Sequence, residues 1–163
     1  MDTEAVREFI RESNAIENVT TEAAVESSMD AWEFLCEQPE LTHYVVQEAH
    51  EYILEDLQPD IAGEYRDIAV HIGGDVAPPP QVVRPQMDTL LKWKPDSSLE
   101  AIEWHIAFEH IHPFADGNGR IGRLLYLWHC KELDITPIIW RADDRQGYYE
   151  LFGSEIDIAA HID

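Results

Sequence analysis

The twelve residues HPFADGNGRIGR, at positions 112–123, contain the residue types that phosphate chemistry needs. Gly117 and Gly119 have no Cβ, so the backbone there can approach a ligand closely. A helix that begins at this point would direct free amides and its positive dipole end toward an anion. Arg120 and Arg123 are three residues apart and share one face of the first helical turn, which suits a polyphosphate.

Two more side chains of this stretch indicate a reaction. Asp116 alone would repel phosphate, so we expect it to bind a divalent ion, most simply Mg²⁺, that bridges to phosphate oxygens. His112 ends the preceding helix, and its neutral imidazole can accept a proton from a hydroxyl near neutral pH. Together these groups indicate phosphoryl or nucleotidyl transfer. A plain turn with surface arginines explains GNGR alone but not the whole combination.

The elements that must position this loop are mainly helical. Apolar residues at helical spacing predict a helix in TEAAVESSMDAWEFLCEQ, capped by Thr20 or Thr21. A second helix is predicted in LTHYVVQEAHEYILEDL and ends at Gln58-Pro59. A third is predicted in RPQMDTLLKWK.

The strongest helix predictions flank the loop. DSSLEAIEWHIAFEHIH has Ser97 and Glu100 at capping-box spacing, and its expected inner face is Leu99, Ile102 and Ile106. The helix after the loop starts near Asn118, and its expected inner face is Ile121, Leu124, Leu125 and Trp128. A connector, ITPIIW, leads to a last helix predicted in DRQGYYELFGSEIDIAAHI.

One stretch, YRDIAVHIGGDVAPPPQVV, has strand character. Ile68, Val70 and Ile72 alternate with other residues, Gly73-Gly74 can form a turn, and the prolines at 78–80 prevent a central strand afterwards. This predicts a short exposed hairpin at about residues 67–80, whose free edge would accept a peptide by strand addition. A long surface loop is the alternative. The fold class expected is an all-α bundle with one hairpin.

Composition limits the partners of this chain. Its 163 residues are 45% hydrophobic, which supports one domain, residues 1–163, with a sizeable core. The 33 acidic and 11 basic residues give a formal net charge of −22 at pH 7, which disfavours nonspecific binding to nucleic acid or an anionic membrane. Lysine occurs only at positions 92, 94 and 131, and such a surface suits high salt, so a halophilic source is expected.

Cellular location is also constrained. The two cysteines, Cys36 and Cys130, are far apart and lie in no metal-ligand spacing, which indicates a reduced, intracellular protein. The charged start MDTEAVREFIRES contains no secretory signal. No apolar run approaches the roughly 20 residues that span a bilayer. We therefore expect a cytoplasmic protein.

The loop resembles the signature of the Fic (filamentation induced by cAMP) family, His-x-Phe-x-Asp/Glu-Gly-Asn-Gly-Arg-x-x-Arg, at every defined position. FEHIHPF resembles the lead-in of that family, and DRQGYY resembles a downstream segment, with Asp144 where asparagine is common. GEYRDIAVHIGG followed by PPP is similar to the flap of the family. The resemblance covers about residues 13–152 and implies a Fic-type helical bundle with a β-hairpin flap beside the active-site loop.

What the resemblance implies is a protein adenylyltransferase, which uses ATP and Mg²⁺ to attach AMP to a Ser, Thr or Tyr hydroxyl of a target protein. His112 would be the general base, Asp116 would hold Mg²⁺, and Phe114 would anchor the loop. Arg123 would contact the γ-phosphate. The residues implied in ATP binding are Gly117, Asn118, Gly119, Arg120, Arg123, Tyr148 and Tyr149, of which the two tyrosines would lie near the nucleobase and Asn118 and Arg120 would also be catalytic. The flap residues implied in aligning the target peptide are His71, Ile72, Gly73 and Gly74.

A second motif lies near the start of the chain. ESNAIEN reads as a helix end in which Ser13 and Asn14 can cap and Glu17 is a solvated charge. The family resemblance adds another interpretation, because Ser13-x-x-x-Glu17-Asn18 matches its inhibitory pattern, Ser/Thr-x-x-x-Glu-Gly/Asn. By that resemblance, residues 5–18 would be an N-terminal inhibitory helix. Glu17 would pair with Arg123 and occupy the space that the γ-phosphate needs.

Other functions stay open at this point. An equivalent glutamate supports hydrolysis in some relatives, so removal of AMP from a modified target is one alternative. A module that binds ATP without turnover is another. His105, His110 and His112 do not share one helical face, so a zinc hydrolase is disfavoured, and helix packing or hydrogen bonding is expected for the first two. Self-modification and a homodimer are further expectations.

Overall fold

The computed structural model describes residues 1–162 and consists mainly of helices around one core. The helices are α1 (Thr3–Ile16), α2 (Glu22–Cys36), α3 (His43–Leu54), α4 (Val83–Lys92), α5 (Ser98–Ile111), α6 (Asn118–Glu132) and α7 (Arg145–Tyr149). Two short strands, β1 (His71–Ile72) and β2 (Asp75–Val76), pair antiparallel and form the expected hairpin. The all-α prediction is confirmed. Within residues 1–162, no helix has the length and apolar character needed to cross a membrane.

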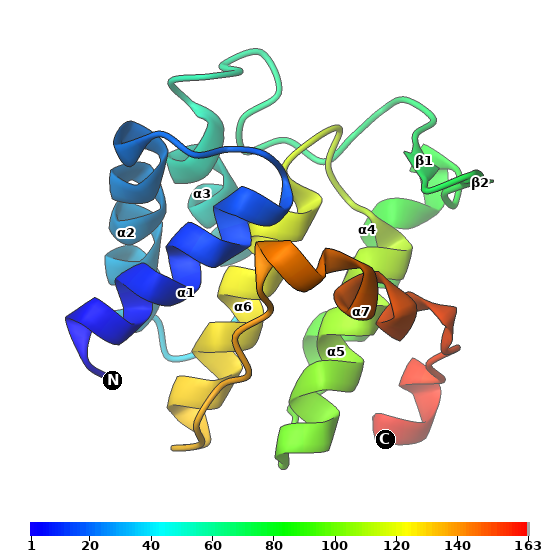
Figure 1. Ribbon diagram of the computed structural model, residues 1–163. Helices are drawn as coiled ribbons and strands as arrows, with labels where there is room; N and C mark the ends of the chain where they lie inside the picture. Colours follow the sequence, from blue (N-terminus) through cyan, green and yellow to red (C-terminus); the bar gives the residue numbers. More distant parts are fainter. Residues whose placement is uncertain (163) are drawn as a thin grey trace.

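The centre of the fold is the antiparallel pair of α5 and α6, which the twelve-residue loop joins. Helices α1, α2 and α3 pack on α6, and α4 packs on α5 (Figure 1). The predicted inner face of α6 is confirmed, because Ile121, Leu124, Leu125 and Trp128 are all buried. Since α6 begins at Asn118, the core holds the start of this helix, and with it the loop, in a fixed place.

Side chains cap the helices where the sequence predicts a cap. Thr21 accepts a hydrogen bond from the amide of Ala24 at the start of α2. Ser97 accepts one from the amide of Glu100 at the start of α5. The Glu100 carboxylate does not complete the capping box, because it accepts hydrogen bonds from the Trp93 indole and the amide of Asp96 instead. Each cap satisfies one amide that a helix start leaves free.

Three sequence predictions about elements are wrong in detail. The second predicted helix ends at Leu54, and the chain turns through residues 55–57 before Gln58. Leu99 is 63% exposed because it lies on the side of the first turn of α5 opposite the fully buried Ala101. The last predicted helix is only α7, followed by 3₁₀ turns at Glu150–Gly153 and Ile158–His161. Extended backbone after Gly153 breaks the helical pattern, and Ile156 and Ile158 pack on the core from separate segments.

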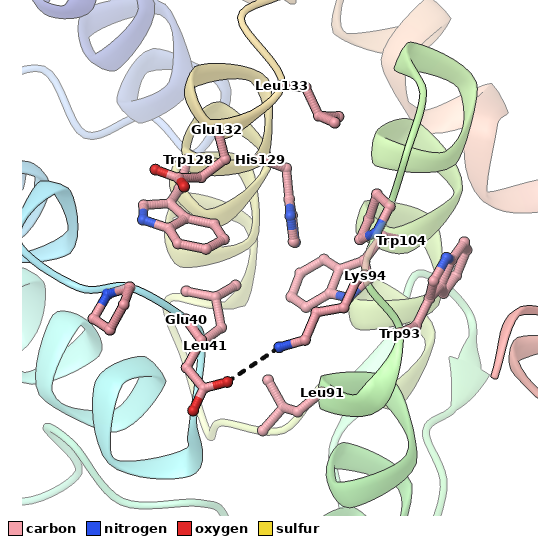
Figure 2. A pocket seen from close by; sticks show the side chains of 12 residues that line it. Glu40, Leu41, Leu91, Trp93, Lys94, Trp104, Trp128, His129, Glu132 and Leu133 are labelled. Carbon is pink, nitrogen blue, oxygen red and sulfur yellow. Dashed lines mark hydrogen bonds and ion pairs between the residues drawn. The ribbon is translucent and has the colours of Figure 1, made fainter. Parts of the chain in front are cut away.

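A cavity of about 300 Å³ lies beside the last turn of α6, at the opposite end of this helix from the loop. In Figure 2 the ring of His129 points between Trp128 and Trp104. An ion pair between Lys94 and Glu40 closes one side, with 3.4 Å between Nζ and Oε2. This cavity is far from the sequence-predicted site and shares no residue with it.

The packing of α6 gives a testable stability difference between two leucines. Leu125→Ala removes a fully buried side chain in the middle of α6, so we expect it to lower the free energy of unfolding by about 2–5 kcal/mol. Leu99→Ala is the matched control, and its exposed side chain predicts a change within about 0.5 kcal/mol. Urea denaturation measures both. Equal losses from the two variants would contradict the burial described for α5 and α6.

Candidate active site

His112 is the C-cap of α5 and has a left-handed backbone, with φ of 52°. This conformation is uncommon for a residue with a side chain, and it turns the chain sharply out of the helix. The carbonyl oxygen of Glu109 lies 3.1 Å from Nδ1 of His112 and can only accept, so Nδ1 carries the proton. Nε2 therefore keeps its lone pair. Burial lowers the pKa of His112, so the ring is neutral at neutral pH and can act as a base.

The loop after His112 is fixed by Phe114 and Asn118. The side-chain oxygen of Asn118 accepts from the amide of Phe114 at 2.9 Å, and its side-chain nitrogen donates to the carbonyl of Phe114 at 2.8 Å. The ring of Phe114 is buried and stacks on His50, with ring centroids 3.7 Å apart. The expected anchor role of Phe114 thus agrees with its burial. The Asn118 side chain is committed to the loop, which leaves its backbone amide for a ligand.

The start of α6 provides an anion-binding site. Gly117 is the N-cap with φ of 80°, a conformation that glycine adopts without strain. A Cβ on Gly119 would collide with the Glu17 carboxylate and lie 2.9 Å from Nη1 of Arg123, so the missing side chain leaves room for charged oxygens there. The guanidinium of Arg120 is buried, and its Nε has no hydrogen-bond partner among the residues described. A buried donor without an acceptor beside free amides is suited to an incoming anion.

Asp116 lies at the exposed rim of the loop. Its carboxylate accepts a hydrogen bond from the Gly117 amide at 2.8 Å and one from the Gln58 side chain at 2.6 Å. Burial would raise its pKa, but these two hydrogen bonds and the charge of Arg120 outweigh burial and lower it, so Asp116 is ionised at neutral pH. Residues 1–162 contain no cluster of three or more metal-binding side chains. A single carboxylate fits Mg²⁺, which takes its other ligands from phosphates and water.

Arg123 is buried among acceptors from three residues. It is 1% exposed, and its Nε donates to the hydroxyl of Ser13 at 2.7 Å. Its Nη2 donates to Glu17 Oε1 at 2.8 Å and to the carbonyl of Ser13 at 2.9 Å. Its Nη1 donates to the hydroxyl of Tyr148 at 3.0 Å. The last turn of α1 therefore covers the second arginine of the loop.

The charge of Arg123 is strongly favoured by these partners. Burial alone would lower its pKa, but Tyr148 and the carboxylate of Glu17 outweigh burial and hold the pKa well above its ordinary value. Removal of Glu17 would leave a buried cation with one charged partner fewer. Such a cation would bind another anion in the same place.

The remaining predicted residues fall into two groups. Tyr148 is buried, and because its hydroxyl accepts from Arg123, that hydroxyl donates to Nε2 of His105 at 2.8 Å. Tyr148 therefore binds the side chain of Arg123 through its hydroxyl. The neighbouring Tyr149 is exposed. Asn18 has φ of 59° directly after α1, and its side-chain oxygen accepts from Arg145 at 3.3 Å. The hairpin residues His71, Ile72, Gly73 and Gly74 form β1 and the turn before β2, and Figure 1 shows this hairpin projecting from the helices.

The two other histidines of α5 take the packing roles expected for them. His105 meets Tyr148, and Nε2 of His110 donates to the carbonyl of Phe152 at 2.8 Å. Neither ring approaches His112 as part of a metal cluster within residues 1–162. The histidines of this helix thus hold the segment after α6 against α5.

Besides Gln58, sequence reasoning missed Glu109 and His50, which also support the site. Glu109 is buried, its Oε1 has no partner among residues 1–162, and burial raises its pKa to about 8. Its Oε2 lies 4.0 Å from Nδ1 of His112. His50 donates from Nε2 to the carbonyl of Asp116 at 2.9 Å and accepts at Nδ1 from the amide of Gly63 at 3.0 Å. The i, i+3 spacing of Glu109 and His112 could have revealed the first, but nothing local points to the second.

The comparison with known families identifies the chain. A model of the Fic/DOC family matches residues 40–130, which is more than half of the chain, so this protein belongs to the Fic/DOC family. It is 36% identical over 110 residues to a protein named Protein adenylyltransferase Fic from Nematostella vectensis, covering 63% of this chain and 26% of that protein. It is 33% identical over 122 residues to the protein of the same name from Drosophila persimilis, covering 71% of this chain and 24% of that protein. The chain thus spans about a quarter of the length of these curated relatives.

Solved structures support the same fold. A Fic domain containing signaling protein from Bacteroides thetaiotaomicron aligns with a TM-score of 0.78 at 22% identity, over 92% of this chain and 71% of that one. A Fic family protein from Desulfovibrio desulfuricans G20 aligns with a TM-score of 0.71 at 26% identity, over 93% and 58%. The alignments extend over nearly the whole chain, beyond the residues 40–130 that the family model matches.

The environment of His112 predicts its titration. Because burial lowers its pKa below the ordinary value of 6.5, we expect its ring to be neutral above that pH and to gain a proton only in more acidic solution. Proton NMR of the imidazole resonances, assigned with His112→Ala, measures the midpoint. A midpoint above 6.5 would contradict the buried, neutral base described here.

Proposed function

We propose that this chain is a protein adenylyltransferase that transfers AMP from ATP to a Ser, Thr or Tyr hydroxyl of a target protein. The observation that carries the proposal is a neutral histidine beside an anion site. Nε2 of His112 is free to accept a proton, and the buried Nε of Arg120 has no acceptor at the start of α6. The family membership and the names of the relatives support the same reaction.

The reaction follows from these groups. The hydroxyl oxygen of the target would attack the α-phosphorus of ATP while its proton passes to Nε2 of His112. The bond between the α-phosphorus and the bridging oxygen breaks, and pyrophosphate leaves. Amides at Gly117, Asn118 and Gly119 would hold the phosphates, and Arg120 would offset the charge that grows on them.

Asp116 would hold Mg²⁺ at the rim of this site. The ion would supply positive charge beside the phosphates. The residues of the chain have a separate task, which is to keep the carboxylate ionised and correctly placed. Gln58 and the amide of Gly117 do this by donating to the two carboxylate oxygens.

We infer that α1 is an inhibitory helix. Arg123 is the residue expected to contact the γ-phosphate, and in this structure it donates to Glu17 and Ser13 instead. A carboxylate and a γ-phosphate would compete for one guanidinium, so ATP would bind in an unproductive pose. Displacement of Glu17, and not a change at His112, would then start the reaction.

The hairpin would dock the target. Its strands are two residues long, and Ile68 and Val76 are exposed, so the edge is free to pair with an extended segment. Tyr149 is exposed beside the buried Tyr148 and is the better candidate for contact with the nucleobase.

Two alternatives use the same site. Hydrolytic removal of AMP would give Glu17 a role with water instead of an inhibitory one. A binding module would take up ATP without transfer. Under either alternative, Glu17→Gly would not raise the incorporation of AMP into protein.

We expect Glu17→Gly to raise self-labelling from α-labelled ATP about tenfold or more, because it frees Arg123 for the γ-phosphate. Glu37→Gly is the matched control, since Glu37 is also the C-cap of a helix and is exposed. Gel autoradiography with Mg²⁺ measures both. Equal labelling of the two variants would count against autoinhibition.

We expect His112→Ala in the Glu17→Gly protein to abolish labelling while ATP binding stays within about threefold, because His112 acts on the proton and not on the phosphates. Isothermal titration calorimetry measures binding, and circular dichroism confirms the fold. Labelling that survives this change would remove His112 as the base. Binding without transfer in the Glu17→Gly protein itself would favour the module.

A further inference from the structure

One buried guanidinium connects the hairpin to the end of the helix that carries His112. Arg66 is 5% exposed, and none of the ion pairs within residues 1–162 includes it. Its Nε donates to the carbonyl of His112 at 2.6 Å, and its Nη2 donates to that of Ile111 at 3.2 Å. On the other side, Nη1 donates to the carbonyl of Ile68 at 3.0 Å and Nη2 to that of Pro78 at 2.6 Å.

On the helix side, the guanidinium of Arg66 satisfies carbonyls at the C-terminal end of α5. The last carbonyls of α5 have no helical partner, and a cation at the negative end of a helix is favourable. The left-handed backbone of His112 is unfavourable for an L-residue, so a hydrogen bond to its carbonyl opposes relaxation of the turn. The backbone amide of Arg66 adds a bond to the carbonyl of Pro113 at 2.9 Å.

On the hairpin side, Arg66 holds both stems. Ile68 precedes β1 and Pro78 follows β2, so their carbonyls lie on opposite sides of the hairpin. Ile68 is 54% exposed and Val76 is 67% exposed, so burial of these side chains does little to anchor the strands. A two-stranded hairpin is marginally stable by itself. The hairpin, which projects from the helices in Figure 1, is thus held at its base by polar contacts.

We propose that Arg66 is a positioning residue that fixes the hairpin and His112 in one spatial relation. This inference rests on the proposed function, in which the hairpin would present the target hydroxyl that His112 deprotonates. Arg66 reaches no substrate, because its donors are used by main-chain carbonyls. A planar guanidinium can bond two segments at once, whereas a lysine ammonium cannot match that geometry.

Arg66 also acts on the charge of His112. Burial is the main cause that lowers the pKa of His112, and the positive charge of Arg66 lowers it further. The groups that oppose this are the carbonyl of Glu109 on α5, Glu17 on α1 and Asp116 on the loop. Loss of the Arg66 charge would therefore raise the pKa of His112, whereas loss of its geometry alone would not.

The first test does not depend on activity. Hydrogen–deuterium exchange with mass spectrometry on Arg66→Lys should detect roughly tenfold faster exchange in residues 68–78, because the bonds to both stems are weakened. Arg84→Lys is the matched control, as Arg84 is exposed on α4. Unchanged exchange at the hairpin in folded Arg66→Lys would overturn the proposal.

The unaltered protein provides a second test in case Arg66→Lys does not fold. In its nitrogen-15 NMR spectrum the Nε proton of Arg66 should exchange with water at least about tenfold more slowly than that of Arg84, since it is buried and bonded to His112. Equal exchange of the two arginine protons would overturn the clamp.

The third test separates positioning from simple stability. In the Glu17→Gly protein, Arg66→Lys should lower self-labelling about tenfold or more, with ATP affinity within about twofold. Arg66→Gln should in addition raise the NMR titration midpoint of His112, while Arg66→Lys should not. Identical midpoints in Arg66→Gln and the parent, with unchanged labelling, would overturn the role. If the Glu17→Gly parent labels nothing, the proposed function fails, while the exchange experiments still decide the role of Arg66.

Discussion

The site depends on which groups accept hydrogen bonds from the buried, charged side chain of Arg123. A guanidinium buried this deeply is stable only with acceptors around it, and the fold supplies them from both ends of the chain. Ser13 and Glu17 come from α1, and Tyr148 comes from α7. The first and last parts of the chain are thus held at the loop by one side chain. Any anion that takes the place of Glu17 must supply equivalent acceptors.

The turn between α5 and α6 sets the chemistry around this arginine. Two residues with left-handed backbone conformation, His112 and Gly117, produce this turn. Main-chain bonds to Asn118 and the stack of Phe114 on His50 keep the turn closed. Because these contacts are buried and made within the chain, they hold the turn without a ligand. A preorganised site of this kind stabilises developing charge without rearrangement.

The acidic composition does not conflict with an anion site. The net charge of −22 is spread over exposed surfaces, whereas Arg66, Arg120 and Arg123 are buried around the loop. Positive charge is therefore concentrated where solvent screening is weakest. The same arrangement explains why few basic residues suffice for the proposed reaction.

Much of the site could be predicted from the sequence because its residues lie within twelve positions. Apolar residues at helical spacing predict α5 and α6, and the glycines indicate the turn between these helices. The clamp of Arg66 could not be predicted, because its partners are main-chain carbonyls up to 46 positions away and carry no side-chain signature. The bonding of the Asn118 side chain within the loop could not be predicted either, because its partners are main-chain groups of Phe114. The prediction of one long last helix was wrong, because the backbone becomes extended after Gly153 and interrupts the helical pattern.

The proposed inhibition requires that Glu17 and the γ-phosphate compete for Arg123. Calorimetric titration of ATP and of AMP into the wild-type protein and into Glu17→Gly tests it most directly, because AMP lacks the γ-phosphate. We expect Glu17→Gly to bind ATP about tenfold more tightly than the wild type does, with AMP affinity unchanged. Equal ATP affinity in the two proteins, or an equal gain for ATP and AMP, would contradict it.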